Sequence, residues 1–287
     1  MSGDEPSEQL AQVQRATTLV LEELDRVCID LGVRYTVYGG TAIGAVRHRG
    51  FIPWDDDADV CMPRPDYERF LDQAPAVLGE AFKIHSPRSD PDYPQTFAVL
   101  GLVGSEFVSQ AARDRPYRMP IGVDLFPLDS LPDDGASYRR QRRSTWLWGR
   151  LLYLRGTPHA QVDLPAPLTH LATGVLHVVH WTMRMLGVSP RLLQSRWERS
   201  ARRFEGSHTE MLGDYSTTDP RHWAVRLDEL FPARRVPFEG IRVMLPRQYD
   251  AVLTRGYGSY MELPAEDERV NHAAAWVTFG PYASPED

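Results

Sequence analysis

The sequence YTVYGGTAIGAVRHRGFIPWDDDADV, residues 35–60, decides how the chain folds, and its neighbours are arranged around it. Residues 35–38 are rich in aromatic and β-branched side chains, which predicts a short strand. Gly39 and Gly40 break that strand, and a short helix is expected from Thr41 to Arg47. A basic turn over 47–50 then leads into an aspartate-rich segment and a second strand, which is expected to end at Met62.

The spacing of the aspartates indicates a metal site. Within a strand, Asp57 and Asp59 would point to the same face, while Ala58 would point into apolar packing. Two adjacent carboxylates repel each other, so one would keep its proton unless a cation lay between them. Mg²⁺ favours carboxylates, phosphates and water as ligands. A pair of solvated loop acids is the alternative for such a motif. Asp55 and Asp56 are expected to hold the turn, and Asp55 would join the metal only if the strand extended that far.

The residues around the glycine pair indicate that an anion binds here. Glycines before a helix let backbone N–H groups approach an anion at the positive end of the helix. Arginines in the basic turn add cationic donors. The residues expected to contact this anion are Gly39, Gly40, Thr41, Arg47, His48 and Arg49. For His48, an ordinary exposed turn residue is the alternative.

Three blocks carry a resemblance to a known family. Residues 39–70, GGTAIGAVRHRGFIPWDDDADVCMPRPDYERF, closely resemble the signature of the LicD family, which includes the fukutin-related proteins. The blocks GVDLFPLD (122–129) and YGSYMELP (257–264) resemble two further family motifs, and His272 follows as a weak candidate. Between 135 and 220 there is little resemblance.

The resemblance implies an α+β fold, a nucleotidyltransferase-like mixed sheet flanked by helices, with an additional helical region. It implies metal-dependent transfer of a phospho-alcohol, such as phosphocholine or a polyol phosphate, from a CDP-linked donor to a glycan or other hydroxyl, with release of CMP. Asp57, Asp59 and Asp124 would be the catalytic and metal-binding residues, holding Mg²⁺ or alternatively Mn²⁺.

Two residues outside the acidic stretch have alternative interpretations. Asp124 lies in an apolar segment, 119–129, that reads as a buried strand, where an unpaired carboxylate is costly. It is either satisfied by backbone donors or an arginine, or it is the third carboxylate of the site on a strand next to Asp59; Asp129 is the weaker choice. Arg64 is either a ligand of the donor phosphates or half of a structural salt bridge.

Two other functions remain open at the level of sequence. A nucleotidyltransferase that places NMP on a small-molecule hydroxyl would need the same acidic edge. A non-catalytic nucleotide-binding protein on the same fold is the third hypothesis, and the combination of Gly-Gly, the Asp57–Asp59 pair and Asp124 argues against it.

Composition limits the partners and the location. The formal charge of −7 argues against a protein that coats nucleic acid. Arginines gather in 139–155 and 191–203, as solvated helix faces or as a surface for anionic lipid or glycan. Two cysteines with no recurring metal-binding spacing argue against structural zinc and favour the cytoplasm, with a single disulfide as the alternative. The polar N-terminus does not read as a signal peptide.

The remaining chain divides into a catalytic core (1–134), a helical region (135–220) and a C-terminal part that completes the core (221–287). Period-3.6 patterns predict a helix over 8–31 capped by Gly32, and a hairpin is expected over 235–245.

The loop 86–95 is expected to shape a substrate pocket. The most hydrophobic stretch, 165–188, predicts a buried or groove-forming helix, with contact at the inner face of a membrane as the second interpretation. The tail, 273–287, shows weak structural signals.

Overall fold

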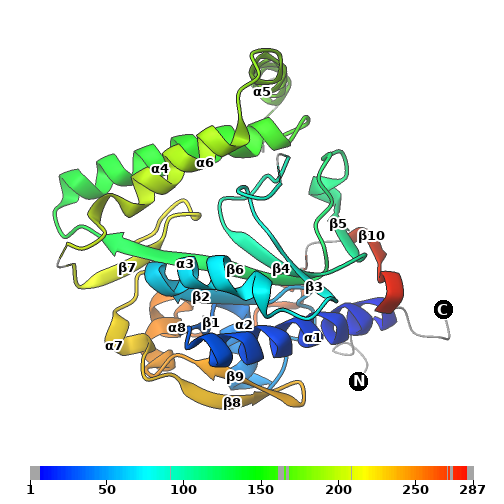
Figure 1. The fold of residues 1–287 in the computed structure, drawn as a ribbon, viewed down its shortest axis with the longest axis vertical. Coiled ribbons are helices and arrows are strands. Elements are labelled where there is room, and N and C mark those ends of the chain that lie inside the picture. The colour runs from blue at the N-terminus through cyan, green and yellow to red at the C-terminus, as the bar shows by residue number, and fades with distance from the viewer. Residues whose placement is uncertain are drawn as a thin grey trace.

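A six-stranded sheet lies at the centre of the computed structural model, which describes residues 7–90, 92–160, 165, 168–207, 209–269, 271 and 274–282 (Figure 1). The sheet order is β1-β2-β6-β4-β3, and β7 pairs with the second half of β6. β2 and β6 are parallel, and the other pairs are antiparallel. The strands are β1 (Thr36–Val37), β2 (Asp59–Pro63), β3 (Phe82–His85), β4 (Ala98–Leu102), β6 (Gly122–Leu131) and β7 (Met211–Asp214). This mixed sheet with helices against it confirms the predicted α+β class.

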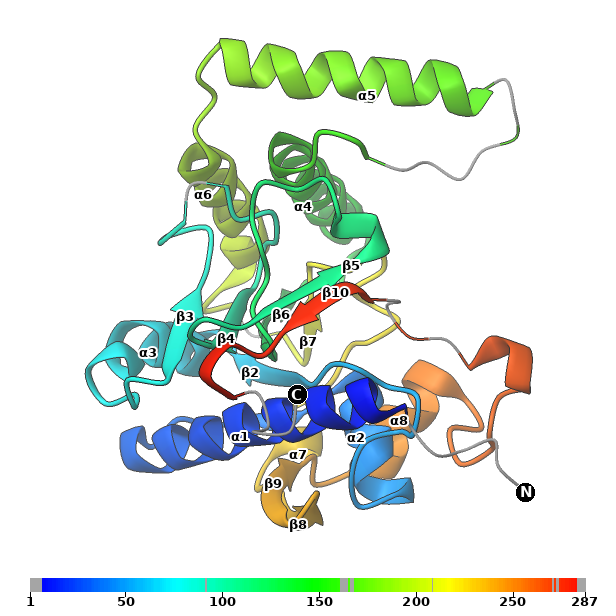
Figure 2. The ribbon, with the colours of Figure 1, turned by 90° about the vertical axis from the view of Figure 1, so that its right-hand side faces the viewer.

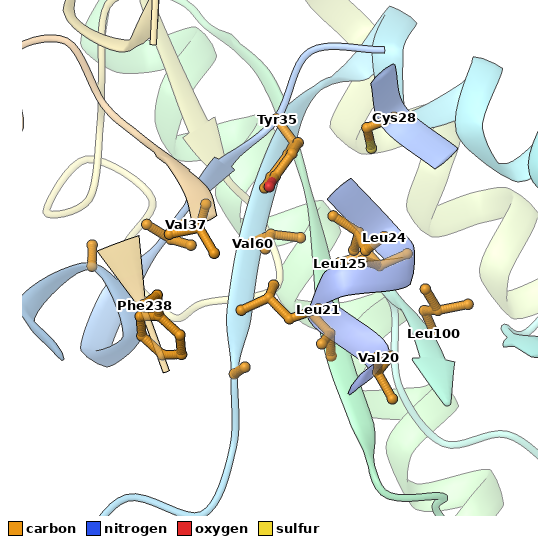
Figure 3. Close-up of a cluster of buried hydrophobic side chains, with 14 of the residues drawn as sticks. Val20, Leu21, Leu24, Cys28, Tyr35, Val37, Val60, Leu100, Leu125 and Phe238 are labelled. Carbon is orange, nitrogen blue, oxygen red and sulfur yellow. The ribbon is translucent and has the colours of Figure 1, made fainter. Parts of the chain in front are cut away.

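The helix α1 (Glu8–Leu31) covers one face of the sheet, as its apolar spacing predicts. Val20, Leu21 and Leu24 are fully buried in one cluster with apolar residues of β2, β4 and β6 (Figure 3). Gly32 ends α1 in the left-handed region, at φ 63°, which glycine adopts without steric cost. The helix α3 (Arg64–Gln73) and the hairpin of β8 (Arg234–Phe238) and β9 (Ile241–Leu245) add residues to this core.

A second, smaller core lies on the other face of the sheet. Tyr38, Cys61 and Leu128 are buried there with Leu230 and Val252. The latter two come from α7 (Leu227–Leu230) and α8 (Tyr249–Tyr257). Because side chains alternate along a strand, Asp59 and Cys61 share this face, whereas Val60 faces α1. Both cysteines are buried and free, so the alternative of a disulfide is wrong.

The helical region lies beyond this second face. The helices α4 (Gly135–Gly156) and α6 (Pro190–Ala201) pack side by side, with Tyr138, Trp197 and Ala201 in a buried cluster with Leu131 of β6 (Figure 1). The chain rejoins the sheet at β7, before the boundary expected at 220. The three-part division of the chain stays a prediction.

The helix α5 (Leu168–Met185) matches its first interpretation only in part: it is not buried, but its Thr169 and Thr173 line a cavity of about 580 Å³. It lies outside α4 and α6 (Figure 2), and only His180 and Met183 of the helix are buried. Leu171 and Val178 are 68% and 64% exposed, because one side of the helix alone has protein to pack against. Within the described part of the chain, no helix is both long and apolar enough to cross a membrane.

Three local expectations need correction. The helix α2 (Gly39–Arg47) begins at the glycine pair rather than after it. β2 begins at Asp59, so Asp57 precedes the strand. The tail contributes a strand, β10 (Ala274–Thr278), that pairs with β5 (Glu106–Ser109). Short 3₁₀ turns complete the fold: η1 (Ala74–Ala76), η2 (Gln110–Ala112), η3 (Arg202–Phe204), η4 (Glu266–Glu268) and η5 (Gly280–Tyr282).

Candidate active site

The pairing of β2 with β6 brings the predicted acids together. Asp59 and Asp124 are direct partners in this parallel pair. Cross-strand partners project to the same face, so both carboxylates lie on the face opposite α1. The Asp124 N–H donates to the carbonyl of Ala58, at 2.8 Å, which fixes the register beside Asp57. The expected placement of Asp124 on a strand next to Asp59 is therefore confirmed.

The segment before β2 adds more acids than the sequence argument assigned. One carboxylate oxygen each from Asp55, Asp56 and Asp57 lies within 4.8 Å of the others. Strand alternation does not place Asp57 beside Asp59, as was predicted, because β2 has not begun at Asp57. A turn brings Asp57 near Asp59 instead, and it also brings Asp55 into the group.

The carboxylates of this cluster repel one another. Burial raises the pKa of Asp59 well above its ordinary value, and Asp57, Asp124 and Asp55 raise it further by repulsion. Burial and the charge of Asp59 also raise the pKa of the neighbouring Tyr257. A set of ligands made only of carboxylate oxygens fits Mg²⁺ or Mn²⁺, which would relieve the repulsion. Metal binding by Asp57, Asp59 and Asp124 stays a prediction.

The glycine pair leaves room for two of these carboxylates. A Cβ on Gly39 would lie 3.0 Å from Oδ2 of Asp59, and one on Gly40 would lie 2.8 Å from Oδ2 of Asp55. Gly39 also has a φ of 54°, which disfavours other residues. Thr41 is buried, and its Oγ1 accepts the Asp59 N–H at 2.8 Å. The first turn of α2 therefore positions the acids, and anion binding by Gly39, Gly40 and Thr41 stays a prediction.

The basic turn lies at the other end of α2, roughly 12 Å from the glycines. Arg47 donates to the carbonyls of Tyr260 and Glu262, at 3.0 and 3.2 Å, and to Nε2 of His48, at 2.8 Å. Burial, followed by the charge of Arg269, lowers the pKa of Arg47. Arg49 is exposed with a φ of 58°. The structure does not bring these three residues to the acids; instead Arg47 fastens α2 to the block 257–264.

Arg64 is not a phosphate ligand in this structure. It is only 3% exposed, and its Nε and Nη2 donate to the two carboxylate oxygens of Asp129, at 2.8 and 2.5 Å. A further bond, at 3.2 Å, reaches Glu68. Arg64 follows the last residue of β2, whereas Asp59 is the first. The structural salt bridge was therefore the correct alternative, and Asp129 belongs to that pair rather than to the acidic cluster.

A cavity of about 170 Å³ opens beside the acids, and its wall includes residues that the sequence did not identify. Asp56, Asp57 and Asp124 line it, together with Gln95, Ser109 and Arg115. Gln95 ends the loop 86–95, so this loop contributes to the wall, and its role in shaping a substrate pocket stays a prediction. No local pattern singles out Ser109 or Arg115, because their position depends on how β5 and η2 fold over the sheet. His272 lies outside the described residues.

Another cavity, of about 850 Å³, is lined by residues including Ile29, Arg34 and Phe231. None of the clustered acids lines it. The volume of a cavity does not by itself identify an active site. We take the acidic cluster as the candidate site because its carboxylates are the groups that could bind a metal ion. Aromatic side chains lie beside the cluster: the rings of Tyr257 and Trp223 are 4.7 Å apart, and those of Trp223 and Tyr38 are 6.1 Å apart.

Together, the mixed sheet, the glycine-led helix and the acids on paired strands define an α+β protein of the nucleotidyltransferase type. A family described as LicD/FKTN/FKRP, nucleotidyltransferase domain, matches residues 32–91, which include the glycine pair and the acids that precede and begin β2. Residues 32–91 are therefore similar to the LicD nucleotidyltransferase domain, and the longer comparison below supports a LicD-like transferase.

Two relatives extend this comparison. The chain is 24% identical over 272 residues to the lipopolysaccharide cholinephosphotransferase LicD of Haemophilus influenzae, covering 92% of this chain and 95% of the relative. It is 36% identical over 52 residues to an uncharacterized protein of Rickettsia typhi, covering 18% of this chain and 17% of the relative. The similarity to the first relative spans the helical region as well as the sheet.

Proposed function

We propose that this protein transfers a phospho-alcohol from a CDP-linked donor to a hydroxyl of a glycan or another acceptor, and releases CMP. The observation that carries the proposal is the pairing of Asp59 with Asp124 on adjacent parallel strands, next to Asp57. Similarity along 92% of the chain to a lipopolysaccharide cholinephosphotransferase supports phosphoryl transfer to a glycan. A phosphocholine-like group and a polyol phosphate are both candidates for the transferred group.

In this proposal the acids bind the metal ion, and one of them also accepts a proton. Asp57, Asp59 and Asp124 hold Mg²⁺ or Mn²⁺, which neutralises charge on the phosphates when bound. The acceptor oxygen forms a bond to the phosphorus that carries the alcohol, and the bond from that phosphorus to the CMP oxygen breaks. Asp124, half-buried at the edge of the cavity, takes the proton of the acceptor hydroxyl.

The test is to incubate the purified chain and Mg²⁺ with lipopolysaccharide and one donor at a time: CDP-choline, CDP-glycerol, CDP-ribitol or CTP. We expect CMP and a product heavier by one phospho-alcohol with a CDP-linked donor, and no activity after chelation. Asp57→Asn and Asp59→Asn should lower turnover at least about 100-fold, since each removes a charged ligand. The exposed Asp72→Asn is the matched control. Pyrophosphate release from CTP with a nucleotide on the acceptor would instead establish the nucleotidyltransferase alternative.

We also propose that the protein contacts the inner face of an anionic membrane through the helical region, as a cytoplasmic peripheral protein. Leu168, Leu171, Val175, Val178 and Met185 follow one another at three- and four-residue steps, with one seven-residue gap, and all are more than half exposed. We call these five residues the outer stripe of α5. Residues 135–204 contain twelve arginines and two acids, a formal charge of +10 in a chain of −7. An apolar stripe flanked by arginine suits the surface of an anionic bilayer.

A further inference from the structure

Arg115 is a buried cation with an unsatisfied donor. It follows η2 and is only 9% exposed, yet its Nε has no hydrogen-bond partner among the described residues. Its guanidinium lies over the ring of Tyr153, with the central carbon 4.9 Å from the ring centroid. A ring face attracts a cation but cannot accept the N–H bonds that water would accept. Burying a guanidinium without these bonds is costly, so an anionic acceptor would stabilise it.

The position of Arg115 relates this cation to the acidic cluster. Arg115 lines the cavity of about 170 Å³ that Asp57 and Asp124 also line. It also lines a second cavity, of about 580 Å³, together with Asp114, His159 and Thr169. The second volume falls within the usual range for small-molecule sites, and the first is too small for a whole nucleotide. Arg115 therefore stands in the wall that the two cavities share.

We propose that Arg115 binds a phosphate group of the donor, in the small cavity, across from the acidic cluster. The guanidinium presents paired donors that match two phosphate oxygens, which would satisfy the Nε that the protein leaves unpaired. The phosphate lies between this cation and the metal-binding acids, and the rest of the ligand occupies the larger cavity. This assignment rests on the proposed function in placing a phosphate-bearing donor at the acids.

The experiment is calorimetric titration of the full chain, in Mg²⁺, with cytidine diphosphate, cytidine and glucose 6-phosphate. Arg115→Gln should weaken cytidine diphosphate binding about tenfold or more, because it removes charged hydrogen bonds, and leave cytidine unchanged. Arg115→Lys should restore part of the loss. The matched control is Arg118→Gln: Arg118 also lies over an aromatic ring, Trp276, at 4.3 Å, but lines neither cavity.

The outcomes separate this assignment from the proposed function, because binding requires no turnover. If no CDP-linked alcohol is consumed but cytidine diphosphate binding still requires Arg115, the proposed transferase function is refuted and the phosphate site is supported. Unchanged diphosphate binding in Arg115→Gln overturns the assignment, as does an equal loss for cytidine, which would mean a structural role. If Arg115→Gln weakened the binding of glucose 6-phosphate alone, Arg115 would contact the acceptor, and the donor assignment would be overturned. A thermal melt of each variant establishes that it is folded.

Discussion

The negative charge of Asp59 destabilises the metal-free fold, although the proposed function needs that charge to bind a metal ion. Its carboxylate is half-buried among other acids, and burial followed by repulsion from Asp57 raises its pKa. An acid with a raised folded pKa holds a proton that the unfolded chain has lost. The metal-free protein should therefore lose stability as the pH rises from the ordinary aspartate range through the raised pKa of Asp59.

Replacing Asp59 tests this conflict. Asp59→Asn removes the buried charge but keeps the backbone bond to Thr41, so the metal-free variant should melt a few degrees higher than the wild type at pH 8. The difference should shrink as the pH falls through the raised pKa of Asp59, because the wild-type carboxyl then takes up its proton. Mg²⁺ should stabilise the wild type and not the variant. Melting curves from pH 5 to 8 measure all three; a variant less stable at every pH, with a normal Mg²⁺ response, would refute the argument.

Arg64 has the opposite character, because its charge is fully paired. Arg64→Ala leaves Asp129, only 2% exposed, without its bidentate partner and should lower the free energy of unfolding by about 3–5 kcal/mol. Urea titration measures the loss, and adding Asp129→Asn should recover part of it. Normal stability in Arg64→Ala, together with lost nucleotide binding, would restore the phosphate interpretation.

Single residues differ in how far the sequence reveals them. Asp57 and Asp59 stand out because acids at close spacing follow a glycine-led helix, and the apolar context marks Asp124. Arg64 was ambiguous, since its partner Asp129 lies 65 positions further along the chain. Arg115 carries no local signal at all: its neighbours look like a solvated basic loop, and residues distant in sequence, among them Tyr153 of α4, cover it.

At the scale of the element, α2 depends on Gly44, which lies against the turn that follows the helix. A Cβ on Gly44 would lie 2.4 Å from the carbonyl oxygen of Gly50, a backbone atom that cannot turn away. Gly44→Ala should therefore lower the free energy of unfolding by about 1–3 kcal/mol. A Cβ on Gly174, in exposed α5, would meet nothing within 4 Å.

The two glycines form a matched pair within helices. Gly174→Ala should raise stability by about 0.5–1 kcal/mol where α5 unfolds with the rest, because alanine costs less backbone entropy in a helix. Chemical unfolding of both variants gives the comparison. Equal effects at the two positions would mean that helix propensity, and not the approach of Gly50 to α2, decides what a glycine does here.

Elements with a clear period were predictable, and those that depend on distant partners were not. α1 and the β8–β9 hairpin follow from spacing and turn residues within one segment. β10 has no comparable signal, and it forms because β5, more than 160 positions earlier, offers its edge. The hydrophobic stretch 165–188 predicted a helix correctly, but apolarity by itself does not say whether protein or another surface covers it.

At the scale of the whole molecule, the acidic site and the basic helical region occupy different parts of one chain. The strands β2 and β6 carry Asp59 and Asp124, whereas α4 and α6, which lie apart from those strands in Figures 1 and 2, contain most of the arginines of the helical region. The larger cavity beside Arg115 is lined by Thr169 and Thr173 of α5, so it reaches from the catalytic side toward the outer helix.

This arrangement predicts binding to anionic vesicles. The chain should float with vesicles that contain phosphatidylglycerol and much less with pure phosphatidylcholine, and added salt should weaken binding by screening the arginines. Leu171→Glu combined with Val178→Glu, both in the outer stripe of α5, should abolish binding because the charges cannot enter the acyl boundary. Both positions are exposed, so the fold should persist.

Ile29→Glu is the control for that experiment, because Ile29 is 54% exposed on α1, away from the helical region, and its loss should leave flotation unchanged. Light scattering of the same proteins tests the rival occupant of the stripe, a second copy of the chain. If the wild type is a dimer that the double variant dissociates, and neither floats with vesicles, the stripe is a protein interface. The arginines of α4 and α6 would then serve only to keep that face hydrated.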